Sequence, residues 1–155
     1  MNIKTRKIVF AALFASLVCV ATMIIKIPSP LSGYINLGDS AVILSGLALG
    51  PYSILAAAVG SCLADVFSGY LVYAPITFVI KGVMAFVVYK FSKKAVIGAI
   101  IAEVIMAAGY YVFEGFLYGF GASLVNIPAN LIQGVAGFIV GMLLIKVFEK
   151  SKITF

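Results

Sequence analysis

The sequence contains no histidine and no tryptophan, and Arg6 is its only arginine. Without histidine, the chain lacks the commonest general acid–base group and a principal zinc ligand. A single arginine provides no guanidinium clamp for phosphate groups. The P-loop pattern G-x-x-x-x-G-K-[ST] is also missing, so we do not expect the chain to hydrolyse ATP itself. These absences argue against an enzyme, and no cofactor or metal site is predicted.

Charged residues are scarce as well. They make up 10% of the 155 residues, whereas hydrophobic residues make up 64%. A water-soluble domain has about a quarter charged residues. A core of this size does not bury so many apolar side chains, so the surplus faces lipid. The sequence therefore predicts a single integral membrane domain over residues 1–155.

Six apolar segments separated by turn signals predict an all-α bundle. They span residues 8–25, 40–49, 53–67, 76–91, 96–117 and 127–148. The second helix is too short to cross a bilayer of roughly 30 Å at about 1.5 Å per residue. Residues 26–39 contain Pro28, Pro30 and Gly33, which do not continue a helix. Because this segment also carries apolar side chains, it fits either a mobile lid or a fixed plug over the bundle mouth.

The basic residues predict an orientation. Eleven Lys and Arg outnumber five Asp and Glu, and the cations bracket the apolar segments. That pattern follows the positive-inside rule and does not indicate a nucleic-acid partner. With a cytoplasmic N-terminus, nine of the eleven cations fall on the cytoplasmic side: Lys4, Arg6, Lys7, Lys90, Lys93, Lys94, Lys146, Lys150 and Lys152. We expect a bacterial plasma-membrane protein with both termini in the cytoplasm.

Polar side chains within predicted membrane helices are costly unless they are partnered, so they mark candidate sites. Asn126, Asn130 and Gln133 lie at i, i+4 and i+7, on one helix face. Glu114 lies about two turns from the outer end of its helix, with Tyr110 on the same face. Such groups within apolar helices predict a pocket for a small polar solute. The candidate ligand contacts are Asn36, Lys81, Tyr110, Glu114, Asn130 and Gln133.

Structural interpretations of the same residues stay open. Asp39 fits a helix N-cap as well as a ligand contact, and so does Asn126. Asp65 and Lys81 fit a structural ion pair between adjacent helices. The two amides that follow Asn126 on its helix face fit packing contacts to a neighbouring helix.

Small residues line one face of the first helix and one face of the sixth. Ala11 and Ala15 lie at i and i+4, and Gly134, Gly137 and Gly141 follow the sixth helix. Small side chains at this spacing let two helices approach closely. We expect the glycines to serve packing within the chain. The alanine face either does the same or receives a partner protein.

Four motifs occur in a characteristic order: A-x-x-x-A in the first helix, then GYINLGD, LADVFSGYLVYAPITFVIKG and NIPANLIQG. Over nearly the whole chain, this order resembles the substrate-binding S components of energy-coupling factor (ECF) vitamin transporters. The resemblance implies a six-helix membrane bundle that binds a vitamin in its outward half. It also implies a transmembrane coupling protein and two cytoplasmic ATPases as partners, with Ala11 and Ala15 docking on the coupling protein. The first loop would cap the site, and the loaded bundle would topple in the membrane to release its cargo.

The identity of the vitamin is less determined. Tyrosines that stack on a ring, and amides that meet its hydroxyls and nitrogens, favour a small, mostly neutral heteroaromatic such as pyridoxine or hydroxymethylpyrimidine. Lys81 is the only well-placed cation, which argues against multiply anionic ligands such as folates. Thiamine, riboflavin and pantothenate stay open. The alternative function is a stand-alone carrier or channel, although no inverted repeat is evident.

Overall fold

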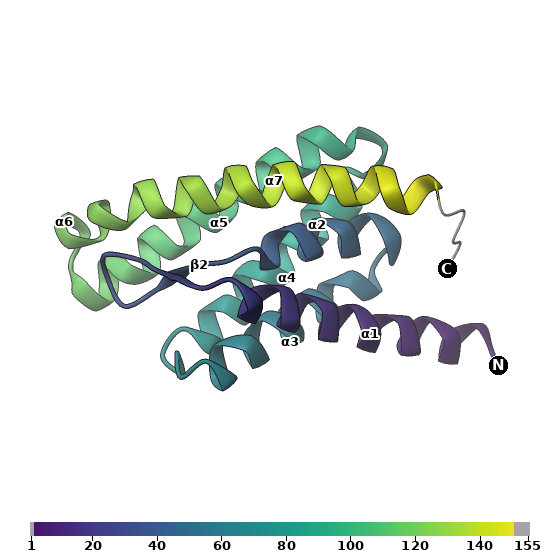
Figure 1. Ribbon diagram of the computed structural model, residues 1–155, viewed down its shortest axis with the longest axis horizontal. Helices are drawn as coiled ribbons and strands as arrows, with labels where there is room; N and C mark the ends of the chain where they lie inside the picture. The colour runs from purple at the N-terminus through teal and green to yellow at the C-terminus, as the bar shows by residue number, and fades with distance from the viewer. Residues whose placement is uncertain (1, 151–155) are drawn as a thin grey trace.

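The structure, a computed structural model, describes residues 2–150, which form an α-helical bundle (Figure 1). Within this range six helices have 11 residues or more: α1 (Ile3–Ile24), α2 (Gly38–Ala48), α3 (Tyr52–Phe67), α4 (Ala74–Lys90), α5 (Ala95–Tyr118) and α7 (Ile127–Lys150). Short helical turns occupy the connections: η1 (Ser92–Lys94), α6 (Phe120–Ser123) and η2 (Leu124–Asn126). The predicted six-helix bundle with a short second helix is confirmed.

Three helical spans within the described residues are long and apolar enough to cross a membrane. They cover Ile3–Ile24, Ser92–Tyr118 and Phe120–Lys150. Large apolar side chains are exposed along the outward faces of these spans, for example Leu13, Phe116 and Leu131. Such a surface suits a lipid environment, because no water-soluble fold leaves so much apolar area uncovered.

The short helix α2 lies in the middle of the bundle. It contacts α1, α3, α4, α5 and α7, and every residue from Gly38 to Gly46 is buried. Protein therefore surrounds α2 on all sides, and its length does not have to match the thickness of the bilayer. This placement explains how a helix too short to span the membrane is accommodated.

The segment between α1 and α2 forms a small β-hairpin, which the sequence did not predict. Strand β1 (Ile27–Pro28) pairs antiparallel with β2 (Tyr34–Ile35), with Ile27 opposite Ile35. Helix α2 then begins at Gly38, two residues before its predicted start. Figure 1 shows the hairpin lying across one end of the bundle, between the ends of the helices.

Positive charge gathers at the opposite end of the bundle. In Figure 1 the beginning of α1 and the end of α7 both lie at that end, far from the hairpin and α6. The basic residues that were assigned to the cytoplasmic side lie in the terminal parts of α1, α4 and α7 and in η1. Lys7, for example, lies 5.8 Å from the ring of Tyr52 at the start of α3. Lys152 lies outside the described residues.

The two faces of small residues both pack within the chain. Ala11 and Ala15 are half-buried against the core, and a Cβ added at Gly60 of α3 would collide with the carbonyl oxygen of Ala15. On α7, a Cβ at Gly137 would lie 2.7 Å from Cβ of Asp39 and 2.8 Å from Oε1 of Glu103. Only glycine permits these helices to approach so closely.

Candidate ligand-binding site

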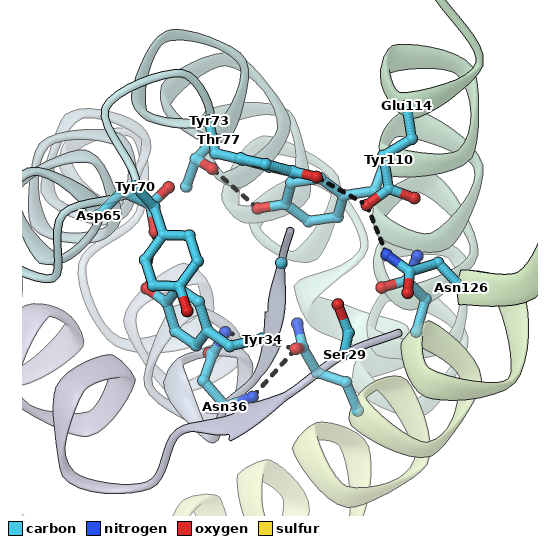
Figure 2. Close-up of a pocket in the computed structure, with 13 residues that line it drawn as sticks. Ser29, Tyr34, Asn36, Asp65, Tyr70, Tyr73, Thr77, Tyr110, Glu114 and Asn126 are labelled. Atoms are coloured by element: carbon cyan, nitrogen blue, oxygen red, sulfur yellow. Dashed lines mark hydrogen bonds between the residues drawn. The ribbon is translucent and has the colours of Figure 1, made fainter. Parts of the chain in front are cut away.

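A polar cavity lies beneath the hairpin (Figure 2). Its walls come from the hairpin segment, the end of α3 and its following loop, α4, α5, η2 and α7. The lining residues are Ser29, Gly33, Tyr34, Asn36, Asp65, Tyr70, Tyr73, Thr77, Tyr110, Glu114, Asn126, Asn130 and Gln133. The free volume inside the cavity is about 30 Å³. That volume holds about two water molecules, so a larger ligand enters only when the walls move apart.

Four tyrosines form a continuous aromatic wall. The ring centroids of Tyr34 and Tyr70 are 4.6 Å apart, those of Tyr70 and Tyr73 6.5 Å, and those of Tyr73 and Tyr110 6.4 Å. The hydroxyl of Tyr110 also lies 3.0 Å from Oγ1 of Thr77, within hydrogen-bond distance. Rings at these separations present both faces and edges, on which a flat ligand stacks.

Glu114 marks one side of the cavity. Its Oε1 accepts hydrogen bonds from Nδ2 of Asn126 at 2.7 Å and from the hydroxyl of Tyr73 at 3.3 Å. Asn126 also accepts the backbone N–H of Leu31 in the hairpin turn at 3.3 Å. Asn126 directly precedes α7, but its side chain bonds to the hairpin and to α5. Helix capping alone therefore does not explain its position. The other carboxylate oxygen of Glu114, Oε2, is buried without a hydrogen-bond partner among the described residues.

Asp65 lies on the opposite side, next to the hairpin (Figure 2). The hydroxyl of Tyr34 donates to its Oδ1 at 2.6 Å. Burial, reinforced by the negative charge of Asp65, raises the pKa of Tyr34 above its usual value, so the hydroxyl keeps its proton and acts as the donor. This bond ties β2 to α3. Oδ2 of Asp65 is buried without a hydrogen-bond partner in the described part of the chain.

A series of buried polar contacts lies next to the cavity and joins the hairpin segment, α7, α2 and α4. Oε1 of Gln133 accepts the backbone N–H of Asn36 at 3.0 Å, and its Nε2 donates to Oδ2 of Asp39 at 2.8 Å. Asp39 forms an ion pair with Lys81, and both side chains are almost fully buried. The suggested pair between Asp65 and Lys81 is therefore wrong, because Lys81 forms its ion pair with Asp39 of α2. Asp39 is not an N-cap either: the N-cap position of α2 is Leu37.

The structure brings five of the six predicted contacts into the cavity lining. They are Asn36, Tyr110, Glu114, Asn130 and Gln133. Nδ2 of Asn130 is buried with no hydrogen-bond partner among the described residues. Lys81 lies outside the lining, with its ammonium nitrogen 5.6 Å from the ring centroid of Tyr110. Its charge is directed to Asp39 and not into the cavity.

Several lining residues were not predicted. The sequence analysis did not assign Tyr34, Tyr70 or Tyr73 to the site. Ser29 and Thr77 were not named, and Gly33 was named only as a residue that does not continue a helix. A signal was available at the start of α4, where Tyr70, Tyr73 and Thr77 are spaced i, i+3 and i+7. Residues at that spacing share a face of a helix or of a helical turn.

A six-helix membrane bundle with a polar cavity closed by a hairpin defines the class: a membrane subunit that binds a small molecule. Residues 2–150 match the family described as "ECF-type riboflavin transporter, S component". The chain belongs to this S component family. It is thus a membrane protein and a substrate-binding transport subunit, not an enzyme, and ATP hydrolysis lies in separate subunits of such transporters.

The chain is also similar to individual proteins. A protein of Pyrococcus woesei, described as "Uncharacterized protein in gap 3'region", is 37% identical over 132 residues, covering 80% of this chain and 88% of the relative. The thiamine precursor transporter HmpT of Lactococcus lactis subsp. cremoris (strain MG1363) is 22% identical over 162 aligned positions, covering 98% and 93% of the two chains. A solved S component of a bacterial ECF transporter superposes with a TM-score of 0.77 at 24% identity, covering 95% of this chain and 97% of that one. This superposition supports the fold alone.

Proposed function

We propose that this subunit captures a small water-soluble vitamin or vitamin precursor with a heteroaromatic ring, such as hydroxymethylpyrimidine or pyridoxine. The observation that carries the proposal is the wall of four tyrosines, which is bordered by carboxylate and amide groups. A flat ring stacks on the tyrosines while the polar groups meet its nitrogens and hydroxyls. The similarity to HmpT, which is described as a thiamine precursor transporter, supports a ligand of this size.

Riboflavin is the second candidate, because the family description names it. Its three fused rings and sugar-alcohol chain make it much larger than a single pyrimidine or pyridine. Since the free volume of the cavity is about 30 Å³, either ligand requires the hairpin to move outward. A single ring requires less movement, which favours the smaller class.

The proposal includes an orientation and a delivery route. The cavity end faces outward across the bacterial plasma membrane and both termini lie in the cytoplasm; the cations at the far end support this placement. The loaded bundle docks on a coupling protein and two ATPases, and it topples to release the ligand inside. Ala11 and Ala15 belong to the proposed docking face. Because both are half-buried against the core, a partner meets them from the side flanked by the exposed Ala12 and Ser16.

Ligand capture and ATP-driven delivery are tested separately. Native mass spectrometry of the purified subunit identifies any ligand retained from the cell. Isothermal titration with hydroxymethylpyrimidine, pyridoxine and riboflavin then ranks the candidates. We expect binding by the subunit alone, but uptake into proteoliposomes only with the coupling protein and the ATPases. Ligand uptake by the subunit without these partners would instead establish a stand-alone carrier or channel.

A further inference from the structure

We infer that the cavity selects a ligand that carries positive charge on or beside its ring. The chemical class is a heteroaromatic with a quaternary ring nitrogen, an aminopyrimidine whose ring nitrogen takes up a proton beside a carboxylate, or a ring with an ammonium group on a short arm. This inference rests on the proposed function and narrows it, because it disfavours neutral ligands such as riboflavin and pyridoxine. It also disfavours ligands with a carboxylate.

The first observation is a pair of carboxylates with unused acceptors. Asp65 is 4% exposed and Glu114 2% exposed, and each has one oxygen without a hydrogen-bond partner among the described residues. A buried charged oxygen that lacks a partner is costly, because it has lost its water without gaining a donor. A ligand that brings N–H donors and positive charge supplies what both oxygens lack.

The second observation is that the cavity lining holds no positive charge. The cavity lining contains Asp65 and Glu114 but no lysine or arginine. Lys81 is a buried cation outside the lining: its charge acts on Asp65, but its ammonium is paired with Asp39. Lys26, at the mouth, is exposed and donates to Oγ of Ser68 at 3.1 Å. The cavity therefore has acidic and no basic groups in its lining, within a low-dielectric bundle, so a cationic ligand is favoured over an anionic one.

The third observation is the position of the tyrosines. Figure 2 shows Asp65 and Glu114 on opposite sides of the cavity, with Tyr70, Tyr73 and Tyr110 around the space between them. The negative faces of aromatic rings attract cations that lie within about 6 Å of the ring centroid. A flat cationic ring on this wall gains both the aromatic contact and a carboxylate at its edge. A neutral ring gains stacking and hydrogen bonds, but not the attraction between opposite charges.

Ligand hydroxyls also donate to carboxylates, so the experiment has to separate charge from hydrogen bonding. Of two matched pairs of probes, the first does so, because its members differ in charge at pH 7; the second compares a pyrimidine that can be protonated with one that stays neutral. Pyridoxamine and pyridoxine differ by an ammonium in place of a hydroxyl. Hydroxymethylpyrimidine and its 4-oxo analogue differ by an amino group in place of a carbonyl. Titrated into the purified subunit at pH 7, the amino member of at least one pair is expected to bind about tenfold more tightly or better.

Charge-removing variants show whether the preference comes from these carboxylates. Asp65→Asn and Glu114→Gln keep the side-chain size and remove the negative charge. At least one of them is expected to weaken binding of the amino member by about 10- to 150-fold, and to change binding of its neutral partner by less than about threefold. Glu149→Gln is the matched control, because Glu149 is exposed near the end of α7, away from the cavity. A melting temperature equal to that of the wild type would show that a variant is folded.

Each outcome separates the inference from the function on which it rests. Equal binding within both pairs, or a preference that survives both variants, overturns the inference. If pyridoxine or riboflavin binds and the amino probes do not, the inference fails and the proposed function stands. If none of the probes binds, both fail.

Discussion

The side-chain amide nitrogen of Gln133 lies 2.8 Å from Oδ2 of Asp39 and donates a hydrogen bond to it. The same side chain accepts the backbone N–H of Asn36, and Asp39 is paired with Lys81. One glutamine thus joins the hairpin segment to α2 and, through Asp39, to α4. The closure of the cavity and the packing of the bundle therefore depend on a shared set of buried polar contacts.

Gln133→Leu should lower the stability of the bundle and loosen the hairpin segment over the cavity. The substitution leaves the N–H of Asn36 without its acceptor and removes one donor from Asp39. Loss of one partner from a buried hydrogen bond costs about 1–3 kcal/mol, so the melting temperature in detergent should fall. The exposed neighbour Ile132→Leu is the control. A melting temperature equal to that of the wild type would show that the Gln133 contacts are not stabilising.

Lys81→Met should destabilise the bundle strongly. It leaves Asp39 charged and unpaired at 0% exposure, and breaking a buried ion pair in this way costs about 3–5 kcal/mol. The double variant Lys81→Met with Asp39→Asn should recover much of that loss and keep ligand affinity within about threefold, because Lys81 does not line the cavity. Chemical denaturation and ligand titration measure the two effects. If the double variant is stable but no longer binds ligand, Lys81 contacts the ligand after all.

Asn130→Ala should weaken ligand binding and leave the fold intact. Nδ2 of Asn130 is buried in the cavity wall without a partner in the described residues, so a ligand is the expected acceptor. Removal of one buried hydrogen bond predicts a loss of roughly 5- to 150-fold in affinity. Leu131→Ala, on the exposed side of the same helix, is the control. If titration gives wild-type affinity for Asn130→Ala, the amide serves helix packing.

The hairpin should become less mobile when ligand binds. Its turn lies close to the site: a Cβ at Gly33 would be 3.8 Å from Oε1 of Glu114. Since the closed cavity is too small for a ring, we expect the hairpin to act as a lid that opens and closes over the ligand. A spin label at Ser32, placed after replacement of Cys19 and Cys62 by alanine, reports this motion with and without saturating hydroxymethylpyrimidine. Identical spectra would identify the hairpin as a fixed plug.

A bulky side chain beside the alanine face should block docking without disturbing the bundle. Ala12 is exposed, whereas Ala15 packs against Gly60 of α3. Ala12→Trp should therefore abolish co-purification with the coupling protein while ligand affinity stays at the wild-type value. Ala15→Trp should lose both, because tryptophan forces α1 away from α3. Ile139→Trp, on the exposed face of α7, is the control, and intact complexes with Ala12→Trp would exclude this face as the docking site.

The sequence by itself determined the class of protein and the number of long helices. A chain that is 64% hydrophobic and 10% charged is expected to fold in a membrane. Gly, Pro and lysine clusters mark the helix ends, and these signals are local. It also identified much of the site, because polar side chains in apolar helices are rare and costly. Asn130 and Gln133 could be placed on one face because helical spacing depends only on position along the chain.

The tertiary structure alone decided which of these groups meet. Lys81 pairs with Asp39, 42 positions away, and not with Asp65, because the fold packs α2 against α4 and brings Asp39 to the lysine. The hairpin has strands of only two residues, too short to show a period of two, and its tyrosine reaches α3 through a single hydroxyl. Such contacts depend on how each helix is rotated about its axis. That rotation is set by close packing between glycines and neighbouring helices, which no local pattern in the sequence records.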